Sequence, residues 1–495
     1  MMGFLSGISI LASLTLGNPF TDGAVLQRDR PVPVWGTADA GATVTVSFAG
    51  QSKSAKVDSS GKWRVNLDPL ATCAEGRDLV ALEHSDNPNN RTILHDILVG
   101  EVWLVSGQSN MDVPLVGTNP RYRDGKGVAE AAITHLPSVR WNIYGWAEKT
   151  WGWHRFEPAE LSRPGAISAV VFYFAREVHR ATGVPVGLVC AYGGGSNIEM
   201  WTPKCGYAKT GLFPELLNWK RIPQSEWTTN FNHGAINHWS KQPSMAFERC
   251  FAPLAPFAAR GLVWYQGEQN AGTDRETYDR KLQALLTGFE TEFENADLKF
   301  YFVQIPRPCS NPEFQMTQAR FVKAHAADGR VKMAIISDIA NTHEVHPAEK
   351  EPVGRRLAHL ALRYDYGFTD LEAESPEPVS ASAASNRVTV AFAHAKRLTV
   401  YNARHSFDSR FELAGADGVF KPAAVVNPLV TREWGKEWRN GELDGAKVEL
   451  EAEGVVAPKA VRYLHSRPYD SNVFNESGLP LGTFSLPVDG KSEDR

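Results

Sequence analysis

The chain has 495 residues, of which 43% are hydrophobic and 22% are charged, values typical of a globular protein able to bury large cores. Its net charge of −4, with Lys and Arg scattered along the chain, gives no electrostatic basis for binding nucleic acid or an anionic membrane. Length alone suggests about three domains. Five widely spaced cysteines form no zinc pattern and no dense disulfide framework, although one disulfide is left open.

Residues 1–96 predict an N-terminal β-sandwich-like module. Residues 43–48 and 62–67 alternate apolar and polar side chains, as half-buried strands do, and a turn rich in Asp, Ser and Gly precedes the second strand. Short strands joined by such turns are typical of a sandwich. The apolar residues 1–14 lack a basic leader region and are too short to span a bilayer. They fit either the remnant of a signal peptide or a first strand, and the partial alternation over residues 8–16 favours the strand.

Residues 97–368 alternate strand and helix patterns, which predicts a parallel α/β sheet flanked by helices. The run over residues 97–105 is almost continuously apolar, as in a strand buried on both faces. Similar runs cover residues 186–191, 261–265 and 331–337. Parallel strands end at one edge of a sheet, where ligands bind, so the polar residues that follow these runs should converge. Helices are predicted after Ser168, around residues 282–289, and over residues 314–327 and 354–364.

Residues 370–385 are rich in Pro, Ser, Ala and Glu and predict a linker or domain edge. Short strand patterns then resume, which predicts a C-terminal β module over residues 369–495. Either terminal module is most simply an accessory unit beside the central domain. The C-terminal strand patterns cover residues 387–392, 397–401, 410–413, 447–450 and 460–463.

The strand over residues 97–105 stops at the sequence Ser-Gly-Gln-Ser-Asn, residues 106–110. A serine on a glycine-assisted turn there exposes its Oγ beside backbone N–H groups, as a nucleophile requires. In isolation, this pattern is more typical of an ordinary strand-to-helix turn with Ser109 as its N-cap. The strand over residues 186–191 is followed by three glycines, and the strand over residues 261–265 by the sequence Gln-Gly-Glu. The strand over residues 331–337 is followed by a loop with two histidines. Their convergence with Ser109 favours an active site.

Four motifs, GQSNM, GGSxxEMW, VWYQGExN and HPxxKxxVGRRLA, occur in this order and resemble the sialate O-acetylesterases of the SGNH-hydrolase superfamily. Related carbohydrate acetylesterases, including acetylxylan esterases, share much of the pattern. Residues 20–28 and 31–36 resemble the N-terminal β region of the family, and residues 462–463 and 475–480 resemble its C-terminal ending, so the resemblance covers nearly the whole chain. It implies an SGNH-hydrolase-like α/β fold and a serine esterase without a cofactor that removes O-acetyl groups from a sugar, first of all a sialic acid.

The resemblance implies that Ser109 is the nucleophile and that His346 is the base that takes its proton. The group that orients the imidazole is left open between Glu344, which occupies the Asp position of the subfamily's Asp-x-His-Pro motif, Asp338 and a backbone carbonyl. His343 stands where the wider superfamily has an Asp. No metal is expected here, because the i, i+3 histidine spacing and the following proline do not fit the helical zinc pattern.

The same motifs imply oxyanion donors at the backbone N–H groups of Ser109, Gly194 and Gly195 and at the side-chain amide of Gln266. Glu199 is expected to hold loops through hydrogen bonds rather than to do chemistry, and Glu268 likewise. The side chains expected to contact the substrate are those of Gln108, Asn110, Glu268 and Trp201.

Two other functions fit the sequence. The first is an acetylesterase acting on xylan or another polysaccharide. The second, from another class, is a non-catalytic carbohydrate-binding protein on a hydrolase scaffold, against which the intact Ser109, His346 and Gln266 argue. The expected partner is an O-acetylated sugar, the oligomeric state is left open, and we expect a periplasmic or secreted location.

Overall fold

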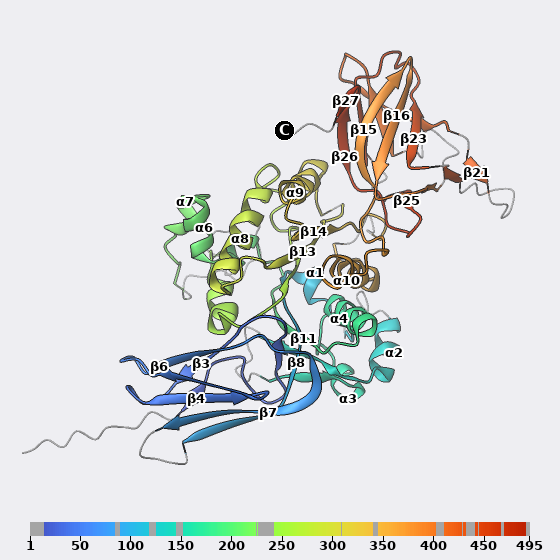
Figure 1. The fold of residues 1–495 in the computed structure, drawn as a ribbon. Helices are drawn as coiled ribbons and strands as arrows, with labels where there is room; N and C mark the ends of the chain where they lie inside the picture. The colour runs from blue at the N-terminus through green and yellow to red at the C-terminus, as the bar shows by residue number, and fades with distance from the viewer. Residues whose placement is uncertain are drawn as a thin grey trace, which may run out of the picture.

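The chain folds into a β-rich N-terminal region, a central α/β region and a C-terminal β region (Figure 1). All five cysteines lie within the described residues, and none forms a disulfide. No helix in the described part of the chain is long and apolar enough to cross a membrane. The computed structural model describes residues 14–84, 90–117, 125–144, 152–223, 225, 242–307, 309–339, 345–401, 410–427, 429–431, 441–443, 445–466 and 470–491.

The central region is built on a sheet whose strands run in the order β10-β9-β11-β8-β12-β13-β14. Neighbours from β9 to β14 are parallel, which confirms the predicted parallel sheet, and β13 is an additional strand between two predicted ones. The register sets Gly107 beside Tyr192 and Tyr265, so three strand ends lie level at one edge. The bounds are β8 Arg91–Gly107, β9 Leu136–Ile143, β10 His154–Phe156, β11 Val186–Tyr192, β12 Gly261–Tyr265, β13 Lys299–Val303 and β14 Val331–Ala334.

Helices cover both faces of this sheet (Figure 1), with α4 and α10 together on one face and α6, α8 and α9 on the other. Ser168 caps α4 as predicted, because its Oγ accepts a hydrogen bond from the Val171 N–H at 3.3 Å. The longer helices are α2 Gly125–Ile133, α4 Ala169–Thr182, α6 Lys204–Thr210, α8 Tyr278–Glu292, α9 Pro312–Ala324 and α10 Glu351–Asp365. The short ones are α1 Ser109–Asp112, α3 Pro158–Leu161, α5 Ile198–Trp201, α7 Pro214–Leu217, a π turn Phe247–Phe251 and a 3-10 turn Ala252–Leu254.

Four N-terminal strands, β2, β4, β5 and β7, are continuous with the central sheet through the 17-residue strand β8, while β1, β3 and β6 form a separate three-stranded sheet. Its first half pairs with β7 and its second half with β11 and β12, so it crosses the predicted boundary at residue 96. One hydrophobic core extends from Leu14 to Ala373 through both regions. Of the predicted first strand, residues 8–13 lie outside the described residues. The strands are β1 Thr15–Leu16, β2 Val25–Gln27, β3 Val32–Thr37, β4 Thr43–Phe48, β5 Gln51–Lys56, β6 Lys62–Leu67 and β7 Cys73–His84.

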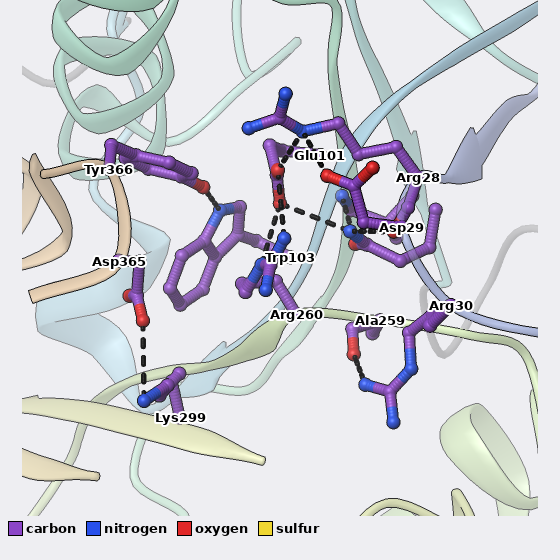
Figure 2. A network of polar contacts seen from close by, with 12 residues as sticks. Arg28, Asp29, Arg30, Glu101, Trp103, Ala259, Arg260, Lys299, Asp365 and Tyr366 are labelled. Carbon is purple, nitrogen blue, oxygen red and sulfur yellow. Dashed lines mark hydrogen bonds and ion pairs between the residues drawn. The ribbon is translucent and has the colours of Figure 1, made fainter. Parts of the chain in front are cut away.

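A buried carboxylate joins the N-terminal region to the central sheet (Figure 2). Glu101 on β8 accepts hydrogen bonds from Arg28 at 2.5 Å and from Arg260 at 2.8 and 3.0 Å. Gln27 adds a third donor at 3.1 Å. Burial alone would raise the pKa of Glu101, but the two guanidinium groups outweigh it and hold the pKa below its ordinary value. Glu101 is therefore ionised and fully paired.

The C-terminal region has its own hydrophobic core, separate from the first. Of the two alternatives predicted for residues 370–385, the linker is wrong in its second half, because β15 occupies Glu377–Ala384 and pairs with β16. Its residues are small and weakly apolar, so the sequence alone does not indicate a strand there, and the strand is defined by its pairing with β16. The strands are β15 Glu377–Ala384, β16 Arg387–Ala393, β17 Leu398–Val400, β18 Phe411–Ala414, β19 Phe420–Pro422, β20 Ala424–Val425, β21 Leu429–Thr431, β22 Gly441–Leu443, β23 Lys447–Glu451, β24 Ala460–Tyr463, β25 Val473–Asn475, β26 Phe484–Pro487 and β27 Gly490–Lys491.

Candidate active site

Ser109 is the first residue of α1 and follows β8 after a single intervening residue. The turn needs glycine at position 107, where φ is +152° and a Cβ would lie 2.2 Å from the carbonyl oxygen of Tyr265. The Gln108 N–H then donates to that same carbonyl at 3.0 Å. This close approach of β8 to β12 points the serine outward from the edge of the sheet.

His346 lies against Ser109, as the sequence predicts. Its Nε2 is 2.7 Å from Ser109 Oγ, although the two residues are 237 positions apart in the chain. With its ring proton on Nδ1, the imidazole accepts a hydrogen bond from the serine hydroxyl, which is the arrangement in which a base takes a proton. Both side chains are partly exposed, so a substrate can reach them.

The structure removes one candidate for the group that orients His346. Both oxygens of Asp338 pair with the guanidinium of Arg356 at 2.7 Å, and Arg356 also donates to the Ile335 carbonyl at 2.8 Å. Asp338 therefore fastens α10 to the end of β14 and is corrected from a candidate orienting group to a structural one. Glu344 and His343 lie outside the described residues.

The glycine turn after β11 lies directly beside the serine. A Cβ on Gly194 would lie 3.7 Å from the Ser109 Cβ, and Gly195 has a φ of +69°. The Gly193 N–H donates to the Gly107 carbonyl at 3.1 Å and ties this turn to the serine turn. Within the described residues, the N–H groups of Ser109, Gly194 and Gly195 make no recorded hydrogen bond, so they are available to an oxyanion.

Gln266 does not present its amide to this space. Its Nε2 donates to Asn270 Oδ1 at 2.7 Å and faces Gln108 Oε1 and the Ser196 carbonyl, each at 3.1 Å. Its Oε1 accepts the Tyr278 hydroxyl at 2.7 Å. The residue is 0% exposed. The expected oxyanion role of Gln266 is therefore corrected to holding the strand ends together.

Three of the four side chains expected to contact a substrate are buried. Trp201 is 0% exposed, and its indole N–H donates to Ser196 Oγ at 2.8 Å. Gln108 is 3% and Asn110 is 1% exposed. These three are corrected from substrate contacts to supports of the site, because a sugar cannot reach them. Glu268 alone of the four is partly exposed.

A buried ion cluster supports the ends of β11 and β12. Lys281 pairs with Glu199 and with Asp274, the latter at 2.7 Å, while Asn270 donates to both carboxylates at 3.0 and 2.7 Å. Burial alone would lower the pKa of Lys281, but the two carboxylates outweigh it and raise the pKa. Glu199 thus holds loops, as expected from the sequence. Among the described residues, no three His, Cys, Asp or Glu side chains are grouped to hold a metal ion.

The sequence interpretation overlooked Lys350, which is 1% exposed and donates to Asn110 Oδ1 at 2.6 Å. Burial lowers the pKa of Lys350 to about 7 and raises the pKa of the neighbouring Glu268. The available signal was the lysine in HPxxKxxVGRRLA, four residues after His346.

Residues 99–363 match the protein family described as "Carbohydrate esterase, sialic acid-specific acetylesterase". The sialate O-acetylesterase of Rattus norvegicus is 28% identical over 411 residues, covering 72% of this chain and 74% of the rat protein. That of Homo sapiens is 26% identical over 394 residues, covering 72% and 71%. The crystal structure of a carbohydrate acetylesterase from Xanthomonas citri is 29% identical, with a TM-score of 0.76, and covers 96% of this chain and 99% of that one.

The helix-flanked sheet, the serine at its edge and these matches define a carboxylic ester hydrolase. The chain belongs to the sialic acid-specific acetylesterase family of carbohydrate esterases.

Proposed function

We propose that the protein hydrolyses O-acetyl esters on sugars, with Ser109 as nucleophile and His346 as general base. The observation that carries the proposal is the 2.7 Å contact between Ser109 Oγ and His346 Nε2 at the edge of the sheet. An SGNH-hydrolase-like fold for the central region is part of the proposal, supported by the level ends of β8, β11 and β12.

The reaction follows from this geometry in two halves. His346 takes the Ser109 proton as Oγ attacks the acetyl carbonyl carbon, and the oxyanion is stabilised by the N–H groups of Ser109 and of Gly194 or Gly195. The imidazolium then gives its proton to the sugar oxygen, which leaves as a hydroxyl group. Water, deprotonated by the same imidazole, attacks the acetyl-serine; acetate leaves, and Ser109 regains a proton.

A sialic acid is the substrate we propose first, because the matching family and the rat and human relatives are named for that activity. A second candidate is an acetylated polysaccharide such as xylan. It is favoured by the Xanthomonas citri protein, which is named only as a carbohydrate acetylesterase and matches nearly the whole chain.

The test is acetate release from O-acetylated sialic acid and from acetylated xylan, measured side by side for the wild type and for Ser109→Ala. We expect Ser109→Ala to lose activity by about a thousandfold or more while its circular dichroism spectrum is unchanged. Ser106→Ala is the matched control, because it removes a buried hydroxyl from β8 three residues earlier. Wild-type protein that binds these sugars without releasing acetate would instead establish the carbohydrate-binding alternative.

A further inference from the structure

The side-chain amide of Asn110 joins three segments beside the Ser109–His346 pair. Its Nδ2 donates to the carboxylate of Glu268 and, at 2.9 Å, to the Val345 carbonyl. Its Oδ1 accepts from Lys350 Nζ at 2.6 Å. Asn110 and Lys350 are each 1% exposed, so solvent does not compete for these bonds.

The positions of these contacts link them to the catalytic pair. Asn110 follows Ser109 directly, and Val345 precedes His346 directly. The hydrogen bond from Asn110 to the Val345 carbonyl therefore ties the segment of the base to the helix of the nucleophile, one residue away from each. A shift of this tie would change the 2.7 Å contact on which proton transfer depends.

Lys350 is the donor that pairs with the acceptor side of the Asn110 amide. An amide has a donor side and an acceptor side, and a 180° rotation would place Oδ1 against the Val345 carbonyl, where two acceptors repel. The Glu268 carboxylate and the Val345 carbonyl hold Nδ2 on their side, and the Lys350 ammonium, which has only donors, holds Oδ1 on the other, so the lysine reinforces one orientation of the amide.

A lysine at this position is costly to bury. Burial disfavours its charged form and lowers the pKa of Lys350 to about 7, against the attraction of the Glu268 carboxylate, and Nζ lies 5.5 Å from the centroid of the Tyr265 ring. A methionine of similar length would pack there without a charge to desolvate. An unfavourable buried cation next to the catalytic pair indicates a functional role.

We propose that Lys350 is a positioning residue of the esterase, acting through Asn110 and the Val345 carbonyl to hold His346 against Ser109. This inference rests on the proposed Ser109–His346 function. Lys350 does not touch the reacting atoms, so its loss should lower kcat and leave KM nearly unchanged. Since the task is to donate a hydrogen bond, a neutral donor should replace it in part.

The experiment compares kcat, KM and Tm for Lys350→Met and Lys350→Gln. We expect Lys350→Met to lower kcat by about 30-fold or more, with KM changed less than about threefold, while Tm reports the separate cost of leaving the buried Asn110 Oδ1 without its donor. Lys350→Gln keeps an N–H donor and should recover at least about tenfold of that loss. Lys332→Met is the matched control, because Lys332 is also a largely buried lysine but pairs with Glu374, and we expect unchanged activity.

Asn110→Ala removes the hydrogen bond to the Val345 carbonyl directly. It should lower kcat as Lys350→Met does, and the double variant should lose less than about twofold more, because the two residues act in series. Fully additive losses, a Lys350→Gln variant no better than Lys350→Met, or a Lys350→Met variant within threefold of wild type would each overturn the role of Lys350. Full activity in Ser109→Ala would instead overturn the proposed function itself, so the two failures are distinguishable.

Discussion

The first prediction concerns the imidazole of His346, whose neutral Nε2 must accept the Ser109 proton. His346→Ala should lose nearly as much activity as Ser109→Ala, and the double variant little more, because members of one catalytic unit are not additive. The kcat/KM of the wild type should fall on acidification as the imidazole becomes protonated. His343→Ala is the control. An inactive His343→Ala beside an active His346→Ala would transfer the role of base to His343.

Glu344 is the carboxylate that we expect to orient His346, now that Asp338 is committed to Arg356. Glu344→Gln should lower kcat by about a thousandfold or more, because an amide stabilises neither the required tautomer nor the imidazolium. The measurement is kcat at a pH where the wild-type rate no longer rises with pH, so that the imidazole is neutral. Asp338→Asn should lower Tm much more than kcat. A loss of only a few fold in Glu344→Gln would leave a backbone carbonyl as the orienting group.

Single residues were predictable from the sequence where a motif places them at a strand end. Ser109 and His346 each follow a buried run, so parallel topology places both at the same edge of the sheet, and their 2.7 Å contact depends on the loop after β14. Gln266 also follows such a run, but its burial depends on Asn270 and Tyr278, whose positions no local pattern reveals. Lys350 belongs to a motif found in the sequence, but its contact with the Asn110 amide, 240 residues earlier, could not be predicted from that motif.

At the scale of the elements, the turn between β8 and α1 depends on Gly107. Gly107→Ala would bring a Cβ within 2.2 Å of the Tyr265 carbonyl oxygen at a φ of +152°. We expect it to lower Tm and to cut kcat by about tenfold or more, because β8 and β12 must separate and carry Ser109 with them. Gly152→Ala is the control, because nothing lies within 4 Å of its Cβ position. Equal activity and Tm in the two variants would contradict the prediction.

The two strands with clear alternation were predicted to the residue, whereas the periodic helices were placed correctly but with other bounds. β4 and β6 match their predicted bounds, because apolar and polar residues alternate along Thr43–Phe48 and Lys62–Leu67 in step with the observed burial. β13 consists of Lys299–Val303, a short apolar run that does not distinguish a strand from a buried helix segment. β15 is a strand through its pairing with β16, which only the folded chain supplies.

At the scale of the whole molecule, the sequence predicts three modules, whereas the described residues form two hydrophobic cores. The first core runs from Leu14 to Ala373, and the second covers the C-terminal strands. Composition and turn patterns marked the change from all-β to α/β near residue 96. They could not show that β8 continues through that boundary, because a long strand reads like two short ones in sequence.

The last prediction tests the joint between the N-terminal region and the central sheet. Glu101→Gln leaves the guanidinium groups of Arg28 and Arg260 facing a neutral buried amide, so the free energy of unfolding should fall by about 3 kcal/mol. Urea denaturation followed by tryptophan fluorescence measures it. Glu294→Gln is the matched control, since its partner Arg64 is exposed and its pair should contribute less than about 1 kcal/mol.

The pH dependence of this joint has a definite sign. The folded-state pKa of Glu101 lies below its ordinary value, because the attraction of the two guanidinium groups exceeds the cost of burial. Its contribution to stability is therefore fully present above the ordinary pKa of a glutamate and is lost as the pH falls through the lowered folded value. The stability difference between wild type and Glu101→Gln should accordingly shrink on acidification. A difference that stays constant from neutral pH down to the acid unfolding of the wild type would show that the carboxylate charge does not hold the two regions together.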